Sequence, residues 1–137
     1  MVLLVVDDNV DQFHLVRALV KELALPHVCH YARDGSQALD FLNRRPPFEV
    51  APRPDLVLLD FNMPGMTGCE VLHELKEDPS LRSIPAIMFS SSRAMNDVNA
   101  CYLEHANAFV QKPMDLDNAM RILDSIDRFW SLVLSTN

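Results

Sequence analysis

Leu56-Val57-Leu58-Leu59-Asp60 is an apolar run that ends in a carboxylic acid, and three other short apolar runs of this 137-residue chain also end in polar residues. Leu3-Leu4-Val5-Val6 leads into Asp7-Asp8, Ala86-Ile87-Met88-Phe89 into Ser90, and Ala108-Phe109-Val110-Gln111 into Lys112-Pro113. Short β-rich runs separated by helix-length segments predict the parallel strands of an α/β sheet. Such sheets bind ligands in a crevice outside the carboxyl ends of their strands. We therefore expect all four polar groups to meet in one crevice.

The segments between these runs have the apolar periodicity of helices. We expect helices at 11–25, after an N-cap at Ser36, after Gly68, at 96–105 and at 116–134, with a further strand at 28–32. Alternating strands and helices with right-handed crossovers predict an α/β fold, a doubly wound five-stranded parallel sheet in the flavodoxin-like order 2-1-3-4-5, with helices on both faces. The length suits one domain, 1–137, without an output domain.

Composition and charge exclude several classes of protein. Hydrophobic residues make up 49% and charged residues 23% of the chain, which is typical of a soluble globular protein. The net charge is -7, and basic residues are not clustered beyond Arg44-Arg45, so nucleic acid is not expected as a partner. No apolar stretch is long enough to span a membrane, and no basic segment of a signal peptide follows Met1. We expect a cytoplasmic protein.

The acidic residues at the strand ends indicate a metal site. Asp7, Asp8 and Asp60 would repel one another strongly in a single crevice unless they shared a cation. An all-oxygen site with few protein ligands suits Mg²⁺. The predicted crevice thus combines an aspartate nucleophile, a divalent ion, a hydroxyl and an ammonium, which is a set suited to phosphoryl chemistry.

This set resembles the receiver domain of two-component response regulators, of the chemotaxis-regulator-like kind, from Val2 to about Phe129. The resemblance is carried by Asp7-Asp8, Asp60, Asn62-Met63-Pro64, Gly68, Ser90 and Lys112-Pro113. It implies that Asp60 accepts a phosphoryl group from a sensor histidine kinase in a Mg²⁺-dependent reaction, with Mn²⁺ able to substitute. It also implies a phosphoacceptor switch, not an enzyme, which assists its own phosphotransfer and dephosphorylation and signals through altered protein-protein interactions.

The resemblance further assigns roles to individual residues. Asp8 and Asp60 would ligate the metal directly, Asn62 would do so through its main-chain carbonyl, and Asp7 would hold a metal-bound water. Lys112, aimed by a cis peptide bond at Pro113, would pair with a phosphate oxygen. Ser90 would donate a hydrogen bond to another phosphate oxygen and form a switch with Phe109. A plain core role for Phe109 is the alternative, because the phenol common at this position is missing.

The segment 116–134 carries more apolar residues than one buried stripe requires, which predicts an interface. Tyr102, His105-Ala106-Asn107 and Phe129-Trp130 are similar to the single-domain regulators paired with bacterial phytochrome kinases, which dimerise through helix 4, strand 5 and helix 5. That resemblance implies a phytochrome-type kinase and a homodimer, while the downstream target stays unknown. The expected interface residues are Tyr102, Ile122, Ile126, Phe129, Trp130 and Val133.

Two other functions compete with the phosphorylation switch. The first is a metal-dependent phosphohydrolase with Asp60-Phe61-Asn62 as an aspartyl nucleophile motif. It is disfavoured because the acidic pair precedes the nucleophile and no inserted segment provides a substrate pocket. The second is an unphosphorylated pseudo-receiver that acts as a binding module. The presence of Asp7, Asp8, Asp60, Ser90 and Lys112 disfavours it.

Overall fold

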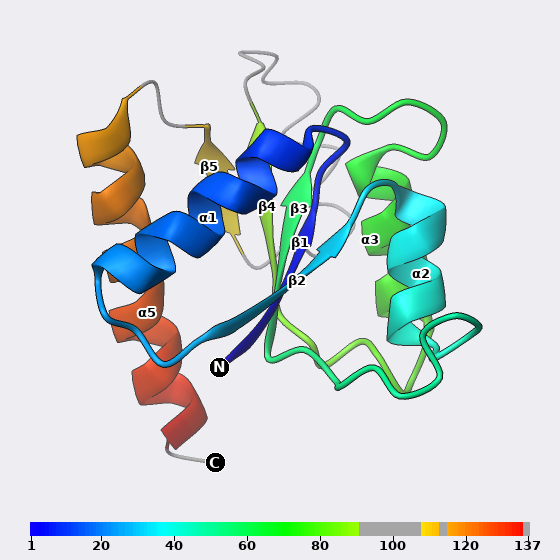
Figure 1. The fold of residues 1–137 in the computed structure, drawn as a ribbon. Helices are drawn as coiled ribbons and strands as arrows, with labels where there is room; N and C mark the ends of the chain where they lie inside the picture. The colour runs from blue at the N-terminus through cyan, green and yellow to red at the C-terminus, as the bar shows by residue number, and fades with distance from the viewer. Residues whose placement is uncertain (91–107, 113–114, 136–137) are drawn as a thin grey trace.

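The structure of the chain is a computed structural model in which residues 1–90, 108–112 and 115–135 are described (Figure 1). The strands within these ranges are β1 (Val2–Val6), β2 (Val28–Ala32), β3 (Leu56–Asp60), β4 (Ala86–Ser90) and β5 (Ala108–Gln111). They form one sheet in the order β2-β1-β3-β4-β5, and each neighbouring pair is parallel. The predicted α/β fold is confirmed, with the strand order β2-β1-β3-β4, and β5 lies beside β4.

The two central strands, β1 and β3, determine where the polar residues lie. All five residues of β3 are buried, as are four of the five in β1. Helices cover both faces of a central parallel strand, so its sequence is continuously apolar and does not alternate with polar residues. The register pairs Val6 with Leu59, and the residues that follow them therefore end up side by side.

The helices form a layer on each face of the sheet (Figure 1). On one face lie α1 (Val10–Glu22) and α5 (Leu116–Ser135), and on the other lie α2 (Gly35–Leu42) and α3 (Gly68–Glu77). Each layer packs its own cluster of buried apolar side chains against the sheet. The predicted helix at 96–105 lies outside the described residues. Within the described ranges, no helix has the length and apolar character needed to cross a membrane.

Side-chain caps fix the starts of the first two helices. The Asn9 side chain accepts a hydrogen bond from the Asp11 amide at 3.0 Å and begins α1. The prediction that Ser36 caps the second helix was wrong. Asp34 is the N-cap, and its carboxylate accepts from the Gln37 amide at 2.8 Å. Asp and Ser are both good N-cap residues, and the sequence alone does not determine which of the two positions is the N-cap.

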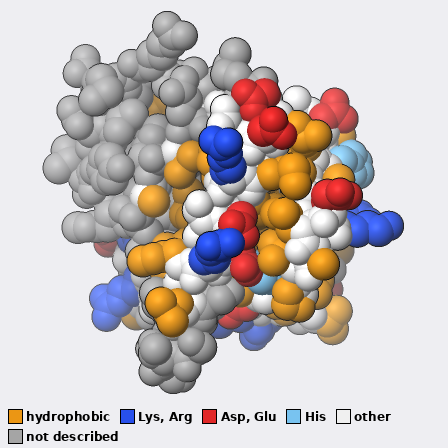
Figure 2. Space-filling view, turned by 90° about the vertical axis from the view of Figure 1, so that its left-hand side faces the viewer, with side chains coloured by type: hydrophobic (Ala, Val, Ile, Leu, Met, Phe, Trp, Pro, Cys, Tyr) orange, Lys and Arg blue, Asp and Glu red, His pale blue; other side chains and the backbone are white. Residues whose placement is uncertain are grey.

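Packing and a side-chain hydrogen bond hold α5 against the rest of the domain. Its buried face carries Ala119, Leu123 and Ile126, which join the cluster on the α1 side. His27 Nε2 lies 2.6 Å from Asp127 Oδ1 on α5, and these side chains are only 2% and 19% exposed. Figure 2 looks onto the side of the molecule where α5 lies, and it shows apolar side chains gathered between charged ones. One face of α5 is therefore covered within the chain, while Phe129 and Leu132 on the same helix are exposed.

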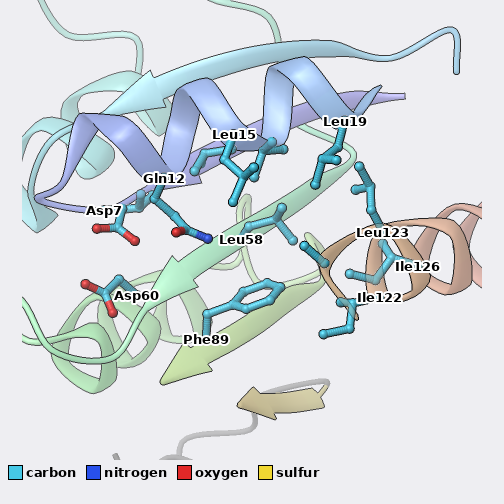
Figure 3. Close-up of a pocket in the computed structure, with 14 residues that line it drawn as sticks. Asp7, Gln12, Leu15, Leu19, Leu58, Asp60, Phe89, Ile122, Leu123 and Ile126 are labelled. Carbon is cyan, nitrogen blue, oxygen red and sulfur yellow. The ribbon is translucent and has the colours of Figure 1, made fainter. Parts of the chain in front are cut away.

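The layer formed by α1 and α5 does not close completely on the sheet. A cavity of about 40 Å³ lies between the two helices and the strands (Figure 3). Most of its lining is apolar, and its polar residues Asp7, Gln12 and Asp60 gather at one end. Sequence periodicity did not predict this cavity, because an apolar stripe shows which face is buried but not how closely that face packs.

Candidate functional site

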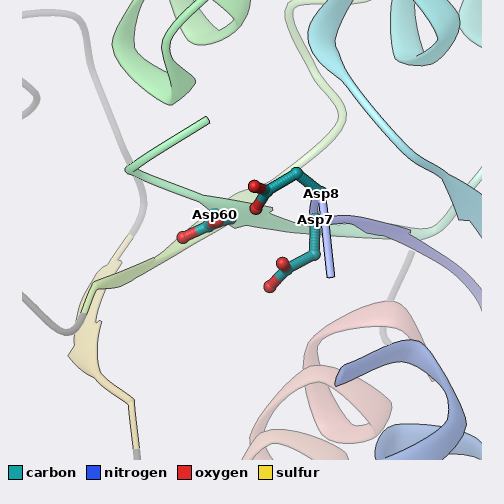
Figure 4. Close-up of side chains that lie close together, drawn as sticks. All are labelled: Asp7, Asp8 and Asp60. Atoms are coloured by element: carbon teal, nitrogen blue, oxygen red, sulfur yellow. The ribbon is translucent and has the colours of Figure 1, made fainter. Parts of the chain in front are cut away.

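The acidic residues expected at the strand ends lie together in the structure (Figure 4). Asp7 directly follows β1 and Asp60 is the last residue of β3, its neighbour in the sheet. With Asp8, they offer carboxylate oxygens that all lie within 4.8 Å of one another. Asp7 and Asp60 are buried, at 2% and 3% exposure, whereas Asp8 is exposed. Three carboxylates so close together form a strongly negative site open to solvent on the Asp8 side.

Lys112 supplies the positive charge that two of these carboxylates share. It directly follows β5, and its Nζ lies 3.1 Å from Asp7 Oδ2 and 3.1 Å from Asp60 Oδ1. Burial alone lowers the pKa of Lys112, but the hydrogen bonds and negative charges of Asp60 and Asp7 outweigh it and raise the pKa overall. Lys112 therefore remains a charged ammonium in the crevice. The same ammonium is close enough to both carboxylates to hold them in place.

Burial determines the protonation of Asp60. The pKa of Asp60 is raised from 3.8 to about 6, chiefly by the loss of hydration on burial and to a smaller extent by the nearby charge of Asp7. Lys112 and the Asn62 amide, which lies 3.3 Å from Oδ1, act in the opposite direction. Asp60 is therefore mainly ionised at neutral pH, and it is a weaker acid than an exposed aspartate. A carboxylate of this kind is more basic, and hence a better nucleophile, than an exposed one.

The loop after β3 approaches the Asp60 backbone closely. Thr67 is the N-cap of α3 and forms a reciprocal capping box with Glu70. The Thr67 hydroxyl accepts a hydrogen bond from the Glu70 backbone amide, and the Glu70 carboxylate accepts one from the Thr67 backbone amide. A Cβ atom added at Gly68 would overlap the Asp60 carbonyl oxygen and the Met88 side chain. The space between α3 and the end of β3 therefore accepts only glycine at this position. The loop is thus fixed at both ends, and it determines where the carbonyl of Asn62 lies.

Some predicted site residues can be placed only in part. Ser90 is the last residue of β4 and Phe109 lies in β5, but the structure describes only the backbone of these two residues. Pro113 and Tyr102 lie outside the described residues. The switch roles of Ser90 and Phe109, and the cis bond at Pro113, therefore stay predictions. The backbone does place Ser90 at the carboxyl end of a strand next to β3, the same end of the sheet at which Asp60 lies.

The structure corrects the expected dimer interface at Ile126. This side chain is 8% exposed, because it packs into the core between α5, α1 and the sheet. Trp130 packs partly against the same core and touches Phe129 edge-on, with ring centroids 4.9 Å apart. The sequence pattern did not distinguish these residues from exposed ones, since all are apolar and lie on one helix. Ile126 is therefore not available to a second chain in this structure.

The exposed apolar side chains of α5 are different from those expected. Within its described side chains, the large exposed ones are Leu116, Phe129 and Leu132, at 57%, 58% and 67% exposure. Only Phe129 belongs to the predicted interface. Ile122 is half-buried, and the side chain of Val133 is not among those described. The open apolar surface of α5 therefore centres on Phe129 and Leu132, which are three residues apart and so lie near each other on the helix.

Comparison with known proteins shows which family has this fold and acidic crevice. The family profile described as "Response regulator receiver domain" matches residues 3–124. The chain belongs to this family. The resemblance inferred from the motifs is thereby confirmed, and the phosphohydrolase alternative is excluded as a family assignment. Receiver domains of response regulators act as phosphoacceptor switches and bind divalent metal, in agreement with the acidic cluster seen here.

Similar proteins include regulators of phytochromes. Response regulator Rcp1 of Synechocystis sp. is 36% identical over 129 residues, which cover 94% of this chain and 88% of that protein. The crystal structure of the phosphorylated cyanobacterial phytochrome response regulator RcpA matches with a TM-score of 0.88 and 34% identity, covering 99% and 95% of the two chains. The Mn²⁺-bound form of Rcp1 matches with a TM-score of 0.85 and 36% identity, covering 94% and 93%. This receiver is thus homologous to phytochrome response regulators.

We expect the buried charge of Asp60 to make the fold less stable as the pH rises. The pKa of Asp60 is raised to about 6, so the folded state binds this proton more tightly than the unfolded chain. The free energy of unfolding should therefore fall between about pH 4 and pH 6. Asp60→Asn should remove that fall and, at neutral pH without metal, raise the free energy of unfolding by on the order of 1 kcal/mol. Urea unfolding of both proteins with a chelator, from pH 4 upwards, measures this effect. An equal fall in the variant would show that other groups cause it.

Proposed function

We propose that this receiver domain accepts a phosphoryl group on Asp60 from a sensor histidine kinase and signals by changing its protein contacts. The observation that carries the proposal is the position of Asp60. It is buried at the end of a central strand, among two further carboxylates and within 3.1 Å of the Lys112 ammonium. Phosphoryl transfer requires a positioned nucleophile and charge neutralisation more than bond-making groups. This crevice supplies both.

We further propose Mg²⁺ as the physiological metal, with Mn²⁺ able to replace it. The donors present are hard oxygen atoms, which suit these ions, and the three carboxylates are close enough to surround one ion. Asp8, Asp60 and the main-chain carbonyl of Asn62 would hold the metal, and Asp7 would hold one of its water molecules. A divalent ion bound there would neutralise the carboxylates and the oxygen atoms of the incoming phosphoryl group.

The residues of the chain then carry the transfer. An Asp60 carboxylate oxygen forms a bond to the phosphorus atom of the kinase phosphohistidine. The P–N bond breaks, and the imidazole leaves with its electron pair. Lys112 pairs with an oxygen of the transferred group, and the Ser90 hydroxyl donates a hydrogen bond to another. A new dianionic group would thereby bias the loop after β4 and, through it, Phe109. The chain assists its own phosphotransfer and later dephosphorylation without turning over a metabolite.

The partner proposed here is a phytochrome-type histidine kinase. Support comes from the names of the similar proteins, since RcpA is described as a cyanobacterial phytochrome response regulator. Another structural relative, at 27% identity and a TM-score of 0.87, is described as acting in red light signaling of R. palustris. The net charge of -7 and the lack of basic clustering beyond Arg44-Arg45 in the sequence argue for protein partners over nucleic acid.

We expect Asp60 to be the stable phosphorylation site. Incubation with a phosphorylated histidine kinase or a small-molecule phosphodonor and Mg²⁺ should label the wild type with a hydroxylamine-sensitive acyl phosphate. Asp60→Asn should abolish the label, because the amide is a poor nucleophile, while circular dichroism shows an intact fold. Asp11→Asn, which alters an exposed acid at the start of α1, is the control and should be labelled like the wild type. Full labelling of Asp60→Asn would refute the assignment.

Metal binding and phosphorylation should depend on the same acids. Asp8→Ala removes a proposed direct ligand and should lose measurable Mg²⁺ binding in calorimetry together with phosphotransfer. Asp7→Ala removes only the group that holds a metal-bound water, so it should keep weak binding. A chelator should stop labelling of the wild type. An unchanged phosphorylation rate in the chelator would show that the crevice works without a metal and that the ligand assignment is wrong.

We also propose that the chain forms a homodimer through the open face of α5. Phe129 and Leu132 expose 58% and 67% of their surface on that helix, and exposed apolar patches on monomers are usually small unless they form interfaces. A two-fold axis would place this face against its own copy. Ile126 is not part of the proposed interface, because the core of the same chain covers it. Trp130 would contribute only through its ring contact with Phe129.

Phe129→Ala should weaken the dimer, because truncation of an aromatic hot spot costs about 2 kcal/mol or more in binding free energy. Sedimentation equilibrium at micromolar concentration should show a shift from dimer to monomer. Val50→Ala is the matched control, since Val50 is an apolar residue that is 95% exposed on the connector between α2 and β3. Wild-type protein that stays monomeric at high concentration, with and without a phosphate mimic, would refute the dimer proposal.

A further inference from the structure

The cavity between α1, α5 and the sheet extends to Asp60, the proposed phosphoacceptor. Asp7 and Asp60 contribute to its lining, and both belong to the acidic crevice described above. The third polar residue of the lining is Gln12 on α1, which no step of the proposed phosphotransfer uses. In Figure 3 its amide extends from the helix toward the sheet, at the same end of the cavity as the two carboxylates. The remaining lining is apolar.

The two carboxylates keep capacity for further hydrogen bonds. An ionised carboxylate accepts about four hydrogen bonds. Asp7 accepts from the Asn9 amide at 2.9 Å and from Lys112 at 3.1 Å. The contacts of Asp60 with described residues, from Asn62 and Lys112, both fall on Oδ1. Within the described residues no fully buried side-chain oxygen lacks a partner, but a carboxylate with spare acceptor capacity can still take a further donor, and a water molecule is the smallest group that supplies one.

The cavity has the space and the polar partners that an ordered water requires. A water needs roughly 10–15 Å³ of such space and two to four polar partners. The cavity measures about 40 Å³, and Asp7, Gln12 and Asp60 supply partners at one end only. The apolar remainder of the lining offers a water nothing to bind. Water should therefore be confined to the polar end.

We propose that Gln12 is a positioning residue that holds an ordered water against the carboxylates of Asp7 and Asp60. Its amide suits this role because it carries a donor and an acceptor on one group. The water would accept from the Gln12 amide nitrogen and donate to the Asp7 carboxylate. This inference rests on the proposed function, in which Asp7 orients a metal-bound water. Gln12 would act on the metal site through Asp7 without touching the metal.

The first turn of α1 holds Gln12 in place relative to Asp7. The backbone N–H of Gln12 donates a hydrogen bond to the backbone carbonyl of Asn9 at 3.1 Å. Asn9 in turn caps the helix through its side chain and donates its own backbone amide to Asp7. The same residue thus connects the helix start and the acidic carboxylate. The Gln12 side chain therefore starts from a fixed backbone position, as a residue that orients another group requires.

The effect of Gln12 should appear in metal affinity. Removing a hydrogen-bond partner that orients a metal-site group typically weakens binding 10- to 100-fold, and an effect that passes through one water should lie near tenfold. Gln12→Met keeps the length and volume of the side chain and removes the amide. We expect about tenfold weaker Mg²⁺ binding by calorimetry and slower phosphorylation at subsaturating Mg²⁺, with the rate restored at saturating Mg²⁺. A purely structural role would not be cancelled by excess metal.

Leu15→Met is the matched control, because Leu15 lines the same cavity with an apolar side chain of similar volume. It should bind Mg²⁺ like the wild type. Gln12→Asn withdraws the amide by one methylene and should weaken binding in the same direction, so it decides the matter if Gln12→Met does not fold. Gln12 variants that bind Mg²⁺ within twofold of the wild type would overturn the inference, as would an equal loss in Leu15→Met. A wild type that binds no Mg²⁺ and is not labelled would instead overturn the proposed function.

Discussion

One ammonium group shared by two buried carboxylates is the interaction on which the architecture of the site depends. Lys112 follows the edge strand β5, whereas Asp7 and Asp60 lie at the ends of the central strands β1 and β3. Leaving either carboxylate buried without its cation would cost several kcal/mol of folding free energy. Residues 105 positions apart in the sequence must therefore meet, and only a sheet with aligned carboxyl ends brings them together.

Much of this arrangement could be predicted from the sequence, because parallel strands impose it. Each apolar run gives one strand, the parallel direction places the following residue at a common edge, and Asp7, Asp60 and Lys112 follow their runs directly. No information about side-chain packing is needed for that inference. The close approach of Gly68 to the Asp60 carbonyl also follows from the parallel strands, since the loop after Asp60 must turn back toward the sheet.

Other features could not be predicted, because they depend on small differences in packing. Asp34 and Ser36 are both good N-caps, and the structure uses the first. Ile126 and Phe129 are both apolar residues of one helix, yet only the first meets the core. The role proposed for Gln12 depends on a cavity whose size follows from how closely two helices pack on a sheet. Periodicity describes which face is buried and gives no distance between the layers.

Charge in the crevice also determines the order of events that the chain permits. Three carboxylates and one ammonium leave the site with an excess of negative charge, so a phosphoryl dianion would be repelled before it reached Asp60. A divalent cation among the carboxylates would offset that excess. In the proposed transfer a dianionic group would replace the charge of Asp60, and Lys112 lies 3.1 Å from both Asp60 and Asp7. Because one ammonium is shared, a stronger pull from the phosphoryl group weakens its contact with Asp7. Phosphorylation of Asp60, as proposed, would therefore act directly on Lys112, the residue that follows β5.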